Sequence, residues 1–327
     1  MNLKTELAKR CDLFKAYWQR YLTEEDPVNL YQAAYHLPRA GGKHLRPCLA
    51  LLAGESVQGK QDYILPFASA LELIHNFTLV HDDIMDKSTL RRNIPTVHTK
   101  YSEPTAILAG DLLFAKAFAA LYDLTVDYPT YKELTNALVH CVLEICEGQQ
   151  LDMEYQQKTK VTEAEYLTMV HKKTAVLFRL AARGGAILGG GTTKEIQALT
   201  DYGTCLGLSF QIWDDYLDLS SSKAVLGKDI GNDIRNGKKT LIAVHALSHA
   251  QGNDKKIFST IFGNPKATEK DIRTILTLFR DLDSIDYAKR TASNYTTEAK
   301  KTLENLKDSP AREILTQLID YTMQREK

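Results

Sequence analysis

Two long, nearly continuous apolar stretches of this chain each end in an acidic cluster of the form DDxxD, which begins at Asp82 in one and at Asp214 in the other. Each residue of a helix advances about 100° around the axis, so the first and fifth positions of such a cluster lie about 40° apart. Asp82 and Asp86 therefore share a face, as do Asp214 and Asp218. Carboxylates at this spacing repel one another, and at the end of an apolar helix they are costly unless a cation balances them. Hard oxygen ligands of this kind suit Mg²⁺, so we expect apolar helices that carry metal sites at their ends.

Helical periodicity also dominates the rest of the chain, and the alternation typical of strands is almost absent. Pro66 suits the first turn of the helix that leads to the first acidic cluster. Further helices are expected over residues 106–121, 138–151, 166–188 and 202–219, and amphipathic helices over 271–324 with a break near 308–310. A polar, glycine-containing loop is expected from Ser220 to Gly237. Because the chain has no linker and no short-period repeat, residues 1–327 are predicted to form one all-α domain.

The charge balance and the cysteines narrow the possible classes of function. Lys plus Arg equals Asp plus Glu, at 41 each, which argues against general nucleic-acid binding, since that needs a basic surplus or stripe. The five cysteines have no metal or redox spacing, so reduced, mostly buried thiols are expected. The N-terminus is charged and lacks an apolar signal region, and no uninterrupted apolar run reaches the length of a membrane span. We therefore expect a soluble, cytoplasmic protein without a membrane span.

Basic residues form clusters of their own. The run GGKHLRP places Lys43 and Arg46 three residues apart after two glycines, so a helix or turn would direct both side chains at one anion. Arg91 and Arg92 follow the first acidic cluster within two helical turns, and Arg suits bidentate contacts with phosphate. Three lysines of the second half complete the set: Lys173, Lys228 and Lys238. Each of these residues, taken singly, is more often a solvated charge. Separate acidic and basic clusters together favour two bound anions, one bridged by metal and the other held by side chains.

A few polar residues interrupt the apolar helices. His75 lies about 20° from Asp82 around the helix, so it points to the same side, where it contacts an anion or is simply a satisfied core histidine. Gln211 lies one turn before the second acidic cluster, and Gln149 and Asp152 form a similar polar pair. Buried amides need hydrogen-bond partners, so these residues line the same cavity or merely cap the packing.

This ordered set of motifs resembles the trans-isoprenyl diphosphate synthases of the polyprenyl synthetase family, over nearly the whole chain. The motifs that carry the resemblance are GGKHLRP from residue 41, DDIMD from residue 82, the pair Arg91-Arg92, PTVH from residue 95, ILAGD from residue 107, Gly148-Gln149 with Asp152, Lys173-Thr174, FQIWDDYLD from residue 210, Gly227-Lys228, GNDI from residue 231 and GKKT from residue 237.

The resemblance implies a fold and a reaction. The fold is the all-α isoprenoid synthase fold, with helices around a deep central cavity, usually assembled as a homodimer. The reaction is a trans-prenyl transfer that condenses isopentenyl diphosphate with an allylic diphosphate through Mg²⁺-assisted ionisation, condensation and elimination, with three Mg²⁺ ions in each active site.

The resemblance also implies the roles of individual residues. The Mg²⁺ ligands would be Asp82, Asp86 and Asp214. The supporting acidic residues would be Asp83, Asp152, Asp215 and Asp218. Isopentenyl diphosphate would be held by Lys43, Arg46, His75 and Arg92. The allylic diphosphate would be held by Arg91, Lys173, Lys228 and Lys238. The Thr174 carbonyl and Gln211 would steady the carbocation, and the segment 220–236 with Arg325 and Lys327 would cover the site.

The length of the product is expected to depend on Phe77 and Thr78, which lie five and four residues before Asp82. In the family an aromatic at the fifth position alone is typical of geranylgeranyl (C20) synthases, whereas aromatics at both positions are more typical of farnesyl (C15) enzymes. We therefore expect a C20 product, with a farnesyl or longer polyprenyl product as the alternative. Around the helix Thr78 lies about 40° from Asp82 but Phe77 about 140° away, so the sequence alone does not place the ring in the path of the growing tail.

Three other functions remain open. A class I terpene cyclase also ionises prenyl diphosphates, but its second metal motif is normally an Asn/Ser/Glu-type triad. A non-catalytic subunit of a heteromeric synthase would not need both acidic clusters intact. A divalent-ion-binding helical scaffold would leave the paired arginines and the lysines unexplained.

Two positions depart from the family pattern. His44 stands where many relatives have Arg, and Asn93 stands where Gly is common after the arginine pair. Asn is the residue that best replaces Gly if a left-handed backbone is needed there.

Overall fold

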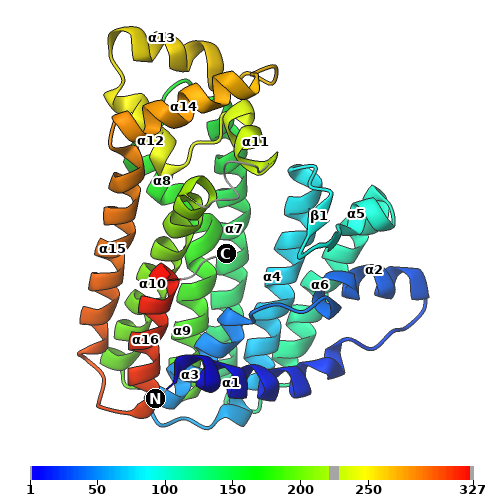
Figure 1. Cartoon of the computed structure of the whole chain (residues 1–327). Coiled ribbons are helices and arrows are strands. Elements are labelled where there is room, and N and C mark those ends of the chain that lie inside the picture. Colours follow the sequence, from blue (N-terminus) through cyan, green and yellow to red (C-terminus); the bar gives the residue numbers. More distant parts are fainter. Residues whose placement is uncertain (1, 221–227, 325–327) are drawn as a thin grey trace. The chain divides into compact units, whose positions relative to one another are not determined.

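Helices make up nearly all of the regular structure, as the all-α prediction requires (Figure 1). The computed structural model describes residues 2–220 and 228–324; for Ser220, for residues 228–230 and for Asn232 it describes the backbone alone. Contacts between Cα atoms divide the chain into two units. The first comprises Met1–Val139, Leu180–Thr200 and Asn305–Leu315, and the second comprises His140–Arg179, Asp201–Glu304 and Thr316–Lys327.

The elements fall into three groups. The first unit contains α1 (Leu3–Trp18), η1 (Gln19–Tyr21), α2 (Val28–Arg39), α3 (Leu45–Ser56), η2 (Gln61–Tyr63), α4 (Leu65–Met85), β1 (Leu90–Arg91), β2 (Ile94–Pro95), α5 (Val97–Lys100) and α6 (Glu103–Tyr122). The second contains α8 (Glu163–Val170), the π-helix η3 (His171–Ala175), α11 (Lys228–Asn236), α12 (Leu241–His249), α13 (Gly252–Ile261), α14 (Glu269–Asp281) and α15 (Ser284–Leu303). Residues of both units form α7 (Tyr128–Gln157), α9 (Val176–Leu188), α10 (Thr193–Ser220) and α16 (Pro310–Gln324).

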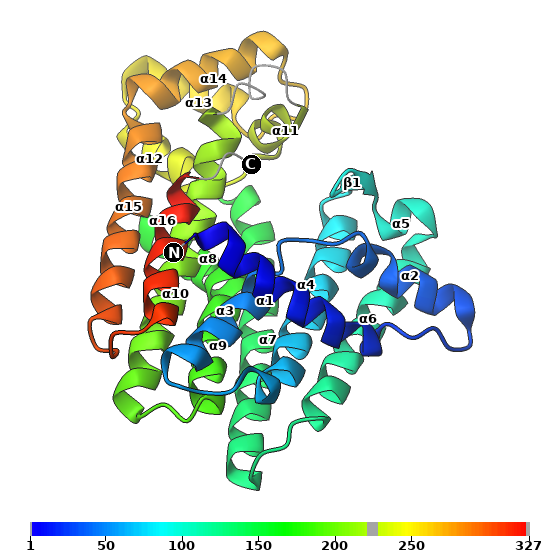
Figure 2. The same ribbon diagram turned by 60° about the horizontal axis from the view of Figure 1, so that its bottom comes forward.

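The helix α4 is the centre of the first unit. Pro66 lies in its first turn, where the missing N–H breaks no hydrogen bond, and residues 65–74 are all buried. A helix that is apolar all round must be enclosed, and α6, α3 and α1 all pack on α4. Both views show α6 running beside α4 (Figures 1 and 2). The acidic end of α4 is thus held by a rigid, fully packed element.

A two-residue hairpin follows α4. Leu90 pairs with Pro95 and Arg91 with Ile94, so Arg92 and Asn93 form the turn, with φ angles of 53° and 63°. Two positive φ angles are typical of the type I′ turn that closes tight hairpins. Asn93 has the left-handed backbone in which Asn best replaces Gly. It allows the two adjacent arginines to leave the chain in different directions.

The core of the second unit gathers side chains from α8, α10, α12, α14 and α15, among them Tyr166, Trp213 and Phe279. In Figure 1, α12, α13 and α14 lie around one end of α15. This core supports the last turns of α10, which carry the second acidic cluster.

Three expectations need correction. The segment 220–237 is not a continuous loop, because α11 occupies Lys228–Asn236. The helix expected over 166–188 is interrupted by a π-helix over His171–Ala175. The cysteines are not mostly buried: Cys48 and Cys141 are, but Cys11 and Cys205 are partly exposed and Cys146 is exposed. The expected break near 308–310 is confirmed, since α15 ends at Leu303 and α16 begins at Pro310.

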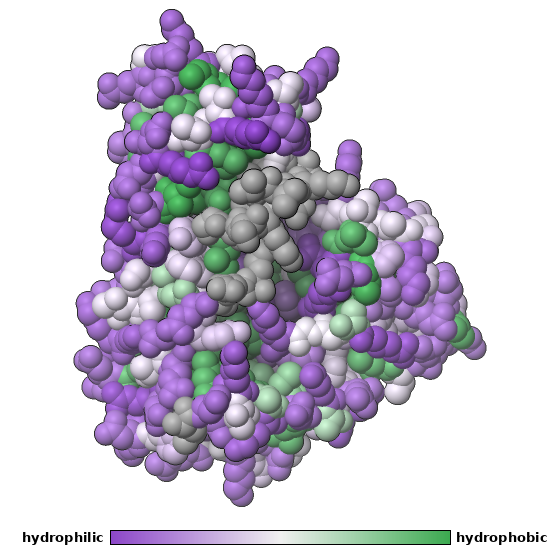
Figure 3. Space-filling model, in the orientation of Figure 1, coloured by the Kyte–Doolittle hydropathy of each residue, from purple (hydrophilic) through white to green (hydrophobic). Residues whose placement is uncertain are grey.

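The surface mixes polar and apolar residues. On the face that Figure 3 shows, hydrophilic side chains predominate and apolar ones form small patches. The helix α6 exposes large apolar side chains, with Leu108 55% and Tyr122 81% exposed. By length and composition α6 could also cross a membrane, and 39% of its most apolar window is buried. A core helix of a soluble protein meets the same criterion, so this is weak evidence against the expectation of no membrane span.

Candidate active site

The first acidic cluster occupies the last turn of α4. Asp82 is partly exposed, and Asp86, the residue that caps the helix, is exposed. Asp83 instead points into the protein, where Arg91 Nε donates to its Oδ1 at 2.7 Å. Burial raises the pKa of Asp83, and the Arg91 guanidinium opposes that shift. The cluster therefore divides into two accessible carboxylates and a third that ties the hairpin to α4.

Both acidic clusters lie at the negative end of a helix. The first lies where α4 ends at Met85, and the second lies within the last turns of α10, which ends at Ser220. Neither helix has a basic residue in its last turn. Carboxylates there lose about 0.3–1 kcal/mol each at an exposed site, because the terminal carbonyl groups repel them. A divalent cation would remove that cost, and a donor set of carboxylate oxygens suits Mg²⁺, so the residues present fit the metal implied by the sequence.

The first basic cluster joins α3 to α4. Arg46 Nη1 donates to His75 Nε2 at 3.2 Å, which leaves the proton of a neutral His75 on Nδ1. Desolvation at this partly buried position holds the pKa of His75 well below its ordinary value, and the charges of Arg46 and Arg92 lower it further. His75 is therefore neutral near pH 7 and can donate Nδ1–H to an anion. Lys43, two residues before α3 begins, is exposed.

Arg92, in the turn of the hairpin, holds the loop between α2 and α3 in place. Arg92 Nη1 donates to the carbonyl oxygens of Gly41 and of Leu37, the latter at 3.2 Å. A Cβ added to Gly42 would lie 3.1 Å from the Arg92 guanidinium carbon, so glycine permits this close approach. Desolvation lowers the pKa of Arg92, although a guanidinium remains charged in any protein. The predicted residues Arg46, His75 and Arg92 are thus brought together.

A buried acid that the sequence analysis missed supports this cluster. His44, the residue before α3, has a left-handed backbone with φ 43°, and its Nδ1 lies 3.0 Å from Glu72 Oε1. Asn76 Nδ2 donates to the Glu72 carbonyl oxygen at 2.8 Å. Both His44 and Glu72 are buried. The sequence does contain a signal for Glu72: it is an acid within the apolar stretch of α4, and a buried carboxylate needs a partner.

In the second unit the middle aspartate is again the buried one. Tyr166 donates its hydroxyl hydrogen to Asp215 Oδ2 at 3.0 Å, and Gln211 Nε2 donates to Asp215 Oδ1 at 3.1 Å. Burial raises the pKa of Asp215 to about 7, against the charge of Lys238 and these two hydrogen bonds. Thr174 donates its hydroxyl hydrogen to Gln211 Oε1 at 3.0 Å, which fixes the amide orientation. Nothing in the sequence singled out Tyr166, since its partner lies 49 positions away.

Two of the predicted lysines lie among carboxylates. Lys173 Nζ is 2.6 Å from Asp152 Oδ2, and Lys238 Nζ is 3.8 Å from Asp233 Oδ2. Burial alone would lower the pKa of Lys238, but the surrounding carboxylates outweigh it and raise that pKa. These carboxylates belong to Asp152, Asp215, Asp218 and Asp233. The charges of Lys238 and its neighbours thus stabilise one another.

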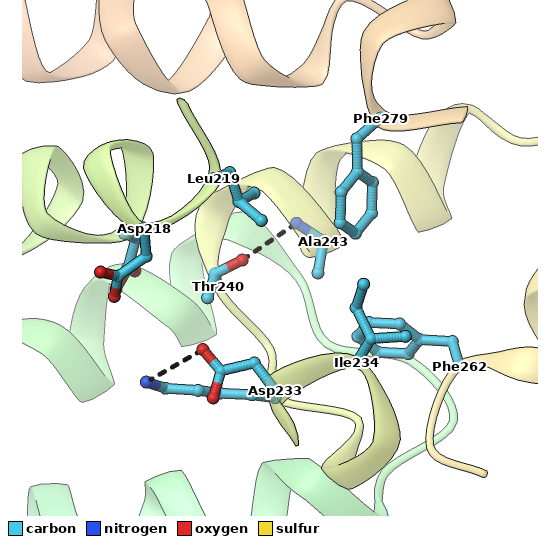
Figure 4. A pocket seen from close by; sticks show the side chains of 10 residues that line it. Asp218, Leu219, Asp233, Ile234, Thr240, Ala243, Phe262 and Phe279 are labelled. Atoms are coloured by element: carbon cyan, nitrogen blue, oxygen red, sulfur yellow. Dashed lines mark hydrogen bonds and ion pairs between the residues drawn. The ribbon is translucent and has the colours of Figure 1, made fainter. Parts of the chain in front are cut away.

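A pocket of the second unit contains several of these groups. Figure 4 shows the carboxylates of Asp218 and Asp233 on one side of it and the rings of Phe262 and Phe279 on the other. Asp215 and Lys238 also line it. Asp233 had no role assigned from the sequence, although it lies five residues before Lys238 and its carboxylate faces the lysine.

The π-helix positions Lys173 and Thr174. The Val176 N–H donates to the His171 carbonyl, five residues earlier, so the turn contains one more residue than an α-helical turn. Two glycines allow neighbouring helices to approach this wider turn. A Cβ on Gly148 would lie 2.3 Å from the Lys173 backbone nitrogen, and one on Gly207 would lie 2.5 Å from the Ala175 Cα. Such π-turns occur frequently at functional sites.

Two predicted roles concern residues beyond the described part of the chain. The side chain of Lys228, and Arg325 and Lys327, lie outside the described residues. Within residues 2–220 and 228–324, no three or more His, Cys, Asp or Glu side chains form a group that could hold a metal ion.

The two residues expected to set product length point in different directions. The Phe77 ring lies 5.4 Å from the Phe114 ring of α6, and Phe114 lies 5.2 Å from Phe118. The Thr78 hydroxyl instead donates to the His75 carbonyl at 2.8 Å. Phe77 therefore belongs to an aromatic row between α4 and α6.

The family model and the most similar relatives reported below all belong to one family of enzymes. The model of the family "Polyprenyl synthetase" matches residues 27–279. A short chain isoprenyl diphosphate synthase of Methanothermobacter thermautotrophicus is 45% identical, covering 100% of this chain and 99% of its own length. A geranylgeranyl diphosphate synthase of Methanosarcina mazei is 41% identical, with the same coverage of both chains.

Solved structures agree with this result. The geranylgeranyl pyrophosphate synthetase of Pyrococcus horikoshii has a TM-score of 0.93 at 40% identity, and the match covers 99% of each chain. A polyprenyl synthase of Caulobacter crescentus, complexed with calcium and isoprenyl diphosphate, has a TM-score of 0.90 at 30% identity and covers 100% of this chain and 98% of its own. The expected isoprenoid synthase fold is confirmed. The chain belongs to the polyprenyl synthetase family, whose members are prenyltransferases.

Proposed function

We propose that this chain condenses isopentenyl diphosphate with allylic diphosphates and that its end product is geranylgeranyl diphosphate (C20). The observation that carries the proposal is that, in both units, an acidic cluster lies beside a cationic side chain: Arg91 bonds to Asp83 in the first unit, and Lys238 interacts with Asp215 and Asp218 in the second. Relatives that are geranylgeranyl diphosphate synthases, 41% identical to this chain, support the C20 product.

The metal would be held by Asp82, Asp86 and Asp214, with three Mg²⁺ ions in each site. Bound Mg²⁺ would supply electrostatic stabilisation of the negative charge that develops on the diphosphate leaving group. The helix ends favour cations there, because their carbonyl groups repel the carboxylates. Asp83 and Asp215 would keep the clusters oriented, since each accepts a hydrogen bond from a fixed neighbour.

Isopentenyl diphosphate would bind at the first basic cluster. Arg46 and Arg92 offer guanidinium groups to its phosphates, and neutral His75 offers Nδ1–H. Lys43 would add an exposed ammonium group. The bond between Arg92 and the Gly41 carbonyl holds the loop in place before substrate arrives, which reduces the ordering needed on binding.

The allylic diphosphate would bind to Arg91, Lys173, Lys228 and Lys238. Lys173 and Lys238 are oriented by Asp152 and Asp233, so their ammonium groups are fixed where an anion can share them. The Thr174 carbonyl and the Gln211 amide oxygen would face the allylic carbocation as it forms. Electrostatic groups fixed in advance in this way stabilise developing charge at little reorganisation cost. The proton lost from the condensed product would leave with the diphosphate.

We also propose that the chain is a homodimer and acts in the cytoplasm. The exposed positions of α6 support the dimer, because a largely apolar helix face is unfavourable in water. No nucleic acid takes part, as the even charge balance indicates.

The test is incubation of the purified chain with Mg²⁺, isopentenyl diphosphate and each of the C5, C10 and C15 allylic diphosphates in turn, followed by mass spectrometry of the dephosphorylated products. The expected result is a series of linear products that ends at C20. A series that ends at C15 or C25 would overturn the product length alone. Cyclic hydrocarbons would indicate a terpene cyclase, and no conversion would favour a non-catalytic subunit. Asp82→Asn, which keeps the shape of the side chain but removes its charge, is the matched inactive control.

A further inference from the structure

Two thiols far apart in sequence meet where α1 crosses the start of α3. Cys48 Sγ lies 3.9 Å from the carbonyl oxygen of Leu7, and in a helix that carbonyl accepts the N–H of the residue four positions on, which is Cys11. Cys11 and Cys48 are therefore close enough for each thiol to shift the pKa of the other. Figure 2 shows α1 lying across α3. The pair has no motif in the sequence, since 36 residues separate its members.

The two thiols differ in access to solvent. Cys11 is partly exposed, whereas Cys48 is 1% exposed. An oxidant in solution can therefore reach Cys11 first, and Cys48 is enclosed beside it. This arrangement matches an attacking cysteine with a resolving cysteine, the usual setting for a reversible disulfide.

The charges around the pair favour a thiolate at the exposed position. The interaction with Cys48, followed by the electrostatic effects of His44 and Lys15, outweighs the effect of burial and lowers the pKa of Cys11 to about 6. The same contact and burial raise the pKa of Cys48 well above its ordinary value. Cys11 is thus the nucleophile near pH 7, because the thiolate is the reactive form of cysteine.

The pair also adjoins the first basic cluster. Along α1, Cys11, Phe14 and Trp18 lie on one face, and the rings of Phe14 and Trp18 lie 5.3 and 6.1 Å from the His44 ring. The Cys48 N–H donates to the His44 carbonyl at 3.0 Å, within the turn that carries Arg46. A covalent bond between the thiols would tie α1 to this turn.

We propose that Cys11 and Cys48 form an oxidisable dithiol, a modification site at which hydrogen peroxide converts the two thiols into a disulfide that fixes the first turn of α3. The Cys11 thiolate sulfur attacks one peroxide oxygen, the O–O bond breaks, and a sulfenic acid and hydroxide result. The hydroxide takes the Cys48 proton and becomes water. The Cys48 sulfur then attacks the Cys11 sulfur, the S–S bond forms, and the S–O bond breaks to release hydroxide, which takes up a proton from solvent. The two cysteines lose two electrons, which reduce the peroxide; a small dithiol reverses the reaction by exchange.

The chemical test uses the full-length chain, first reduced and then treated with hydrogen peroxide in small excess. Wild type and Cys146→Ser, a control at an exposed cysteine outside the pair, are expected to lose two thiols and to give a peptide cross-linked between Cys11 and Cys48. Dithiothreitol should restore both thiols. Cys11→Ser and Cys48→Ala, the second of which keeps the buried site apolar, should each form no cross-link between these two positions. Unchanged thiols in wild type, or a cross-link that involves another cysteine, would overturn the proposal.

A kinetic measurement tests the link to the basic turn, and this part rests on the proposed function. Oxidation is expected to raise the KM for isopentenyl diphosphate at least about threefold in wild type, because the binding turn is held in one position, and to leave Cys11→Ser unchanged. A disulfide that forms without any change in KM would overturn the effect on the turn. A reduced chain without prenyltransferase activity would overturn the proposed function instead, while the thiol measurements would still decide the modification site.

Discussion

His75 is partly buried and lies beside Arg46, so its ring favours the neutral form. This preference links the stability of the fold to pH. The pKa of His75 is lower in the folded chain than the ordinary value of 6.5, so as the pH falls the unfolded chain takes up a proton first. The unfolded state then binds more protons, and the stability of the folded state decreases below about pH 6.5.

The prediction is that the free energy of unfolding decreases as the pH falls from 7 to 5, by up to about 1.4 kcal/mol per pH unit from this residue, and that His75→Gln removes this part of the slope. Urea unfolding at pH 5, 6, 7 and 8 measures it. His140→Gln, at an exposed histidine of α7, is the matched control and should keep the slope of the wild type. Equal slopes in wild type and His75→Gln would show that the ring is not held neutral.

At the scale of single residues, the sequence correctly predicted which side chains share a face when they belong to the same helix. Asp82 and Asp86 share the exposed side of one helix end, as the periodicity requires. The partners of buried groups could not be predicted in the same way. Glu72 meets His44 across 28 positions and Tyr166 meets Asp215 across 49, and such pairings depend on how helices pack rather than on local spacing.

At the scale of elements, the contact between α7 and the π-helix controls where Lys173 and Thr174 lie. A Cβ at Gly148 would lie 2.3 Å from the Lys173 nitrogen and 2.7 Å from the Lys172 carbonyl carbon, so it would press on backbone rather than on a flexible side chain. Gly148→Ala is therefore expected to reduce the free energy of unfolding by about 1–3 kcal/mol and to lower kcat by displacing Lys173.

Urea unfolding and steady-state kinetics measure the two effects. Gln150→Ala, at an exposed position two residues further along α7, should change neither by much. A Gly148→Ala protein with wild-type stability and kcat would mean that α7 and the π-helix can separate without disturbing the lysine.

The π-helix and α11 could not be predicted from the sequence, for two different reasons. Apolar periodicity continues through residues 166–188, so it predicts one helix and carries no sign of the extra residue in the turn. The segment 228–236 is rich in Gly, Asn and Asp, which favour loops, yet Ile234 is 2% exposed and packs in the core of the second unit. Tertiary packing there outweighs local propensity.

The aromatic row between α4 and α6 leads to a prediction about product length. Phe77 lies against Phe114, and a ring on α6 was not considered from the sequence. If this row ends the space for the growing tail, Phe77→Ala and Phe114→Ala should each extend the main product beyond C20. Tyr122→Ala, on the exposed side of α6, should leave the products unchanged.

Mass spectrometry of the dephosphorylated products, with the C15 allylic starter, measures the change. Longer products in both variants would place the limit at the contact between α4 and α6. If only Phe77→Ala extends the product, Phe114 serves packing alone. A product that ends at C20 in both variants would exclude the row as the limit.

At the scale of the whole molecule, α6 exposes apolar side chains whose burial would need a second molecule. Its composition would suit a membrane, yet beyond its first turn its exposed positions recur every three or four residues, which is the spacing of one helix face. Beyond the first turn of the helix these positions are Ile107, Leu108, Asp111, Ala115, Ala119 and Tyr122. A face with small and apolar residues and a single charge suits close contact with another helix better than contact with water.

The last prediction is that this face of α6 holds two copies of the chain together. The wild type should sediment at twice the mass of one 36.8 kDa chain, and the double substitution Leu108→Lys with Ala115→Lys should sediment as a monomer, because two ammonium groups cannot be buried without partners. Tyr63→Lys, at another exposed apolar residue of the first unit, should remain a dimer. A double variant that stays dimeric would place the contact on another surface. A wild type that sediments as a monomer would mean that the face of α6 is covered by something other than a second copy.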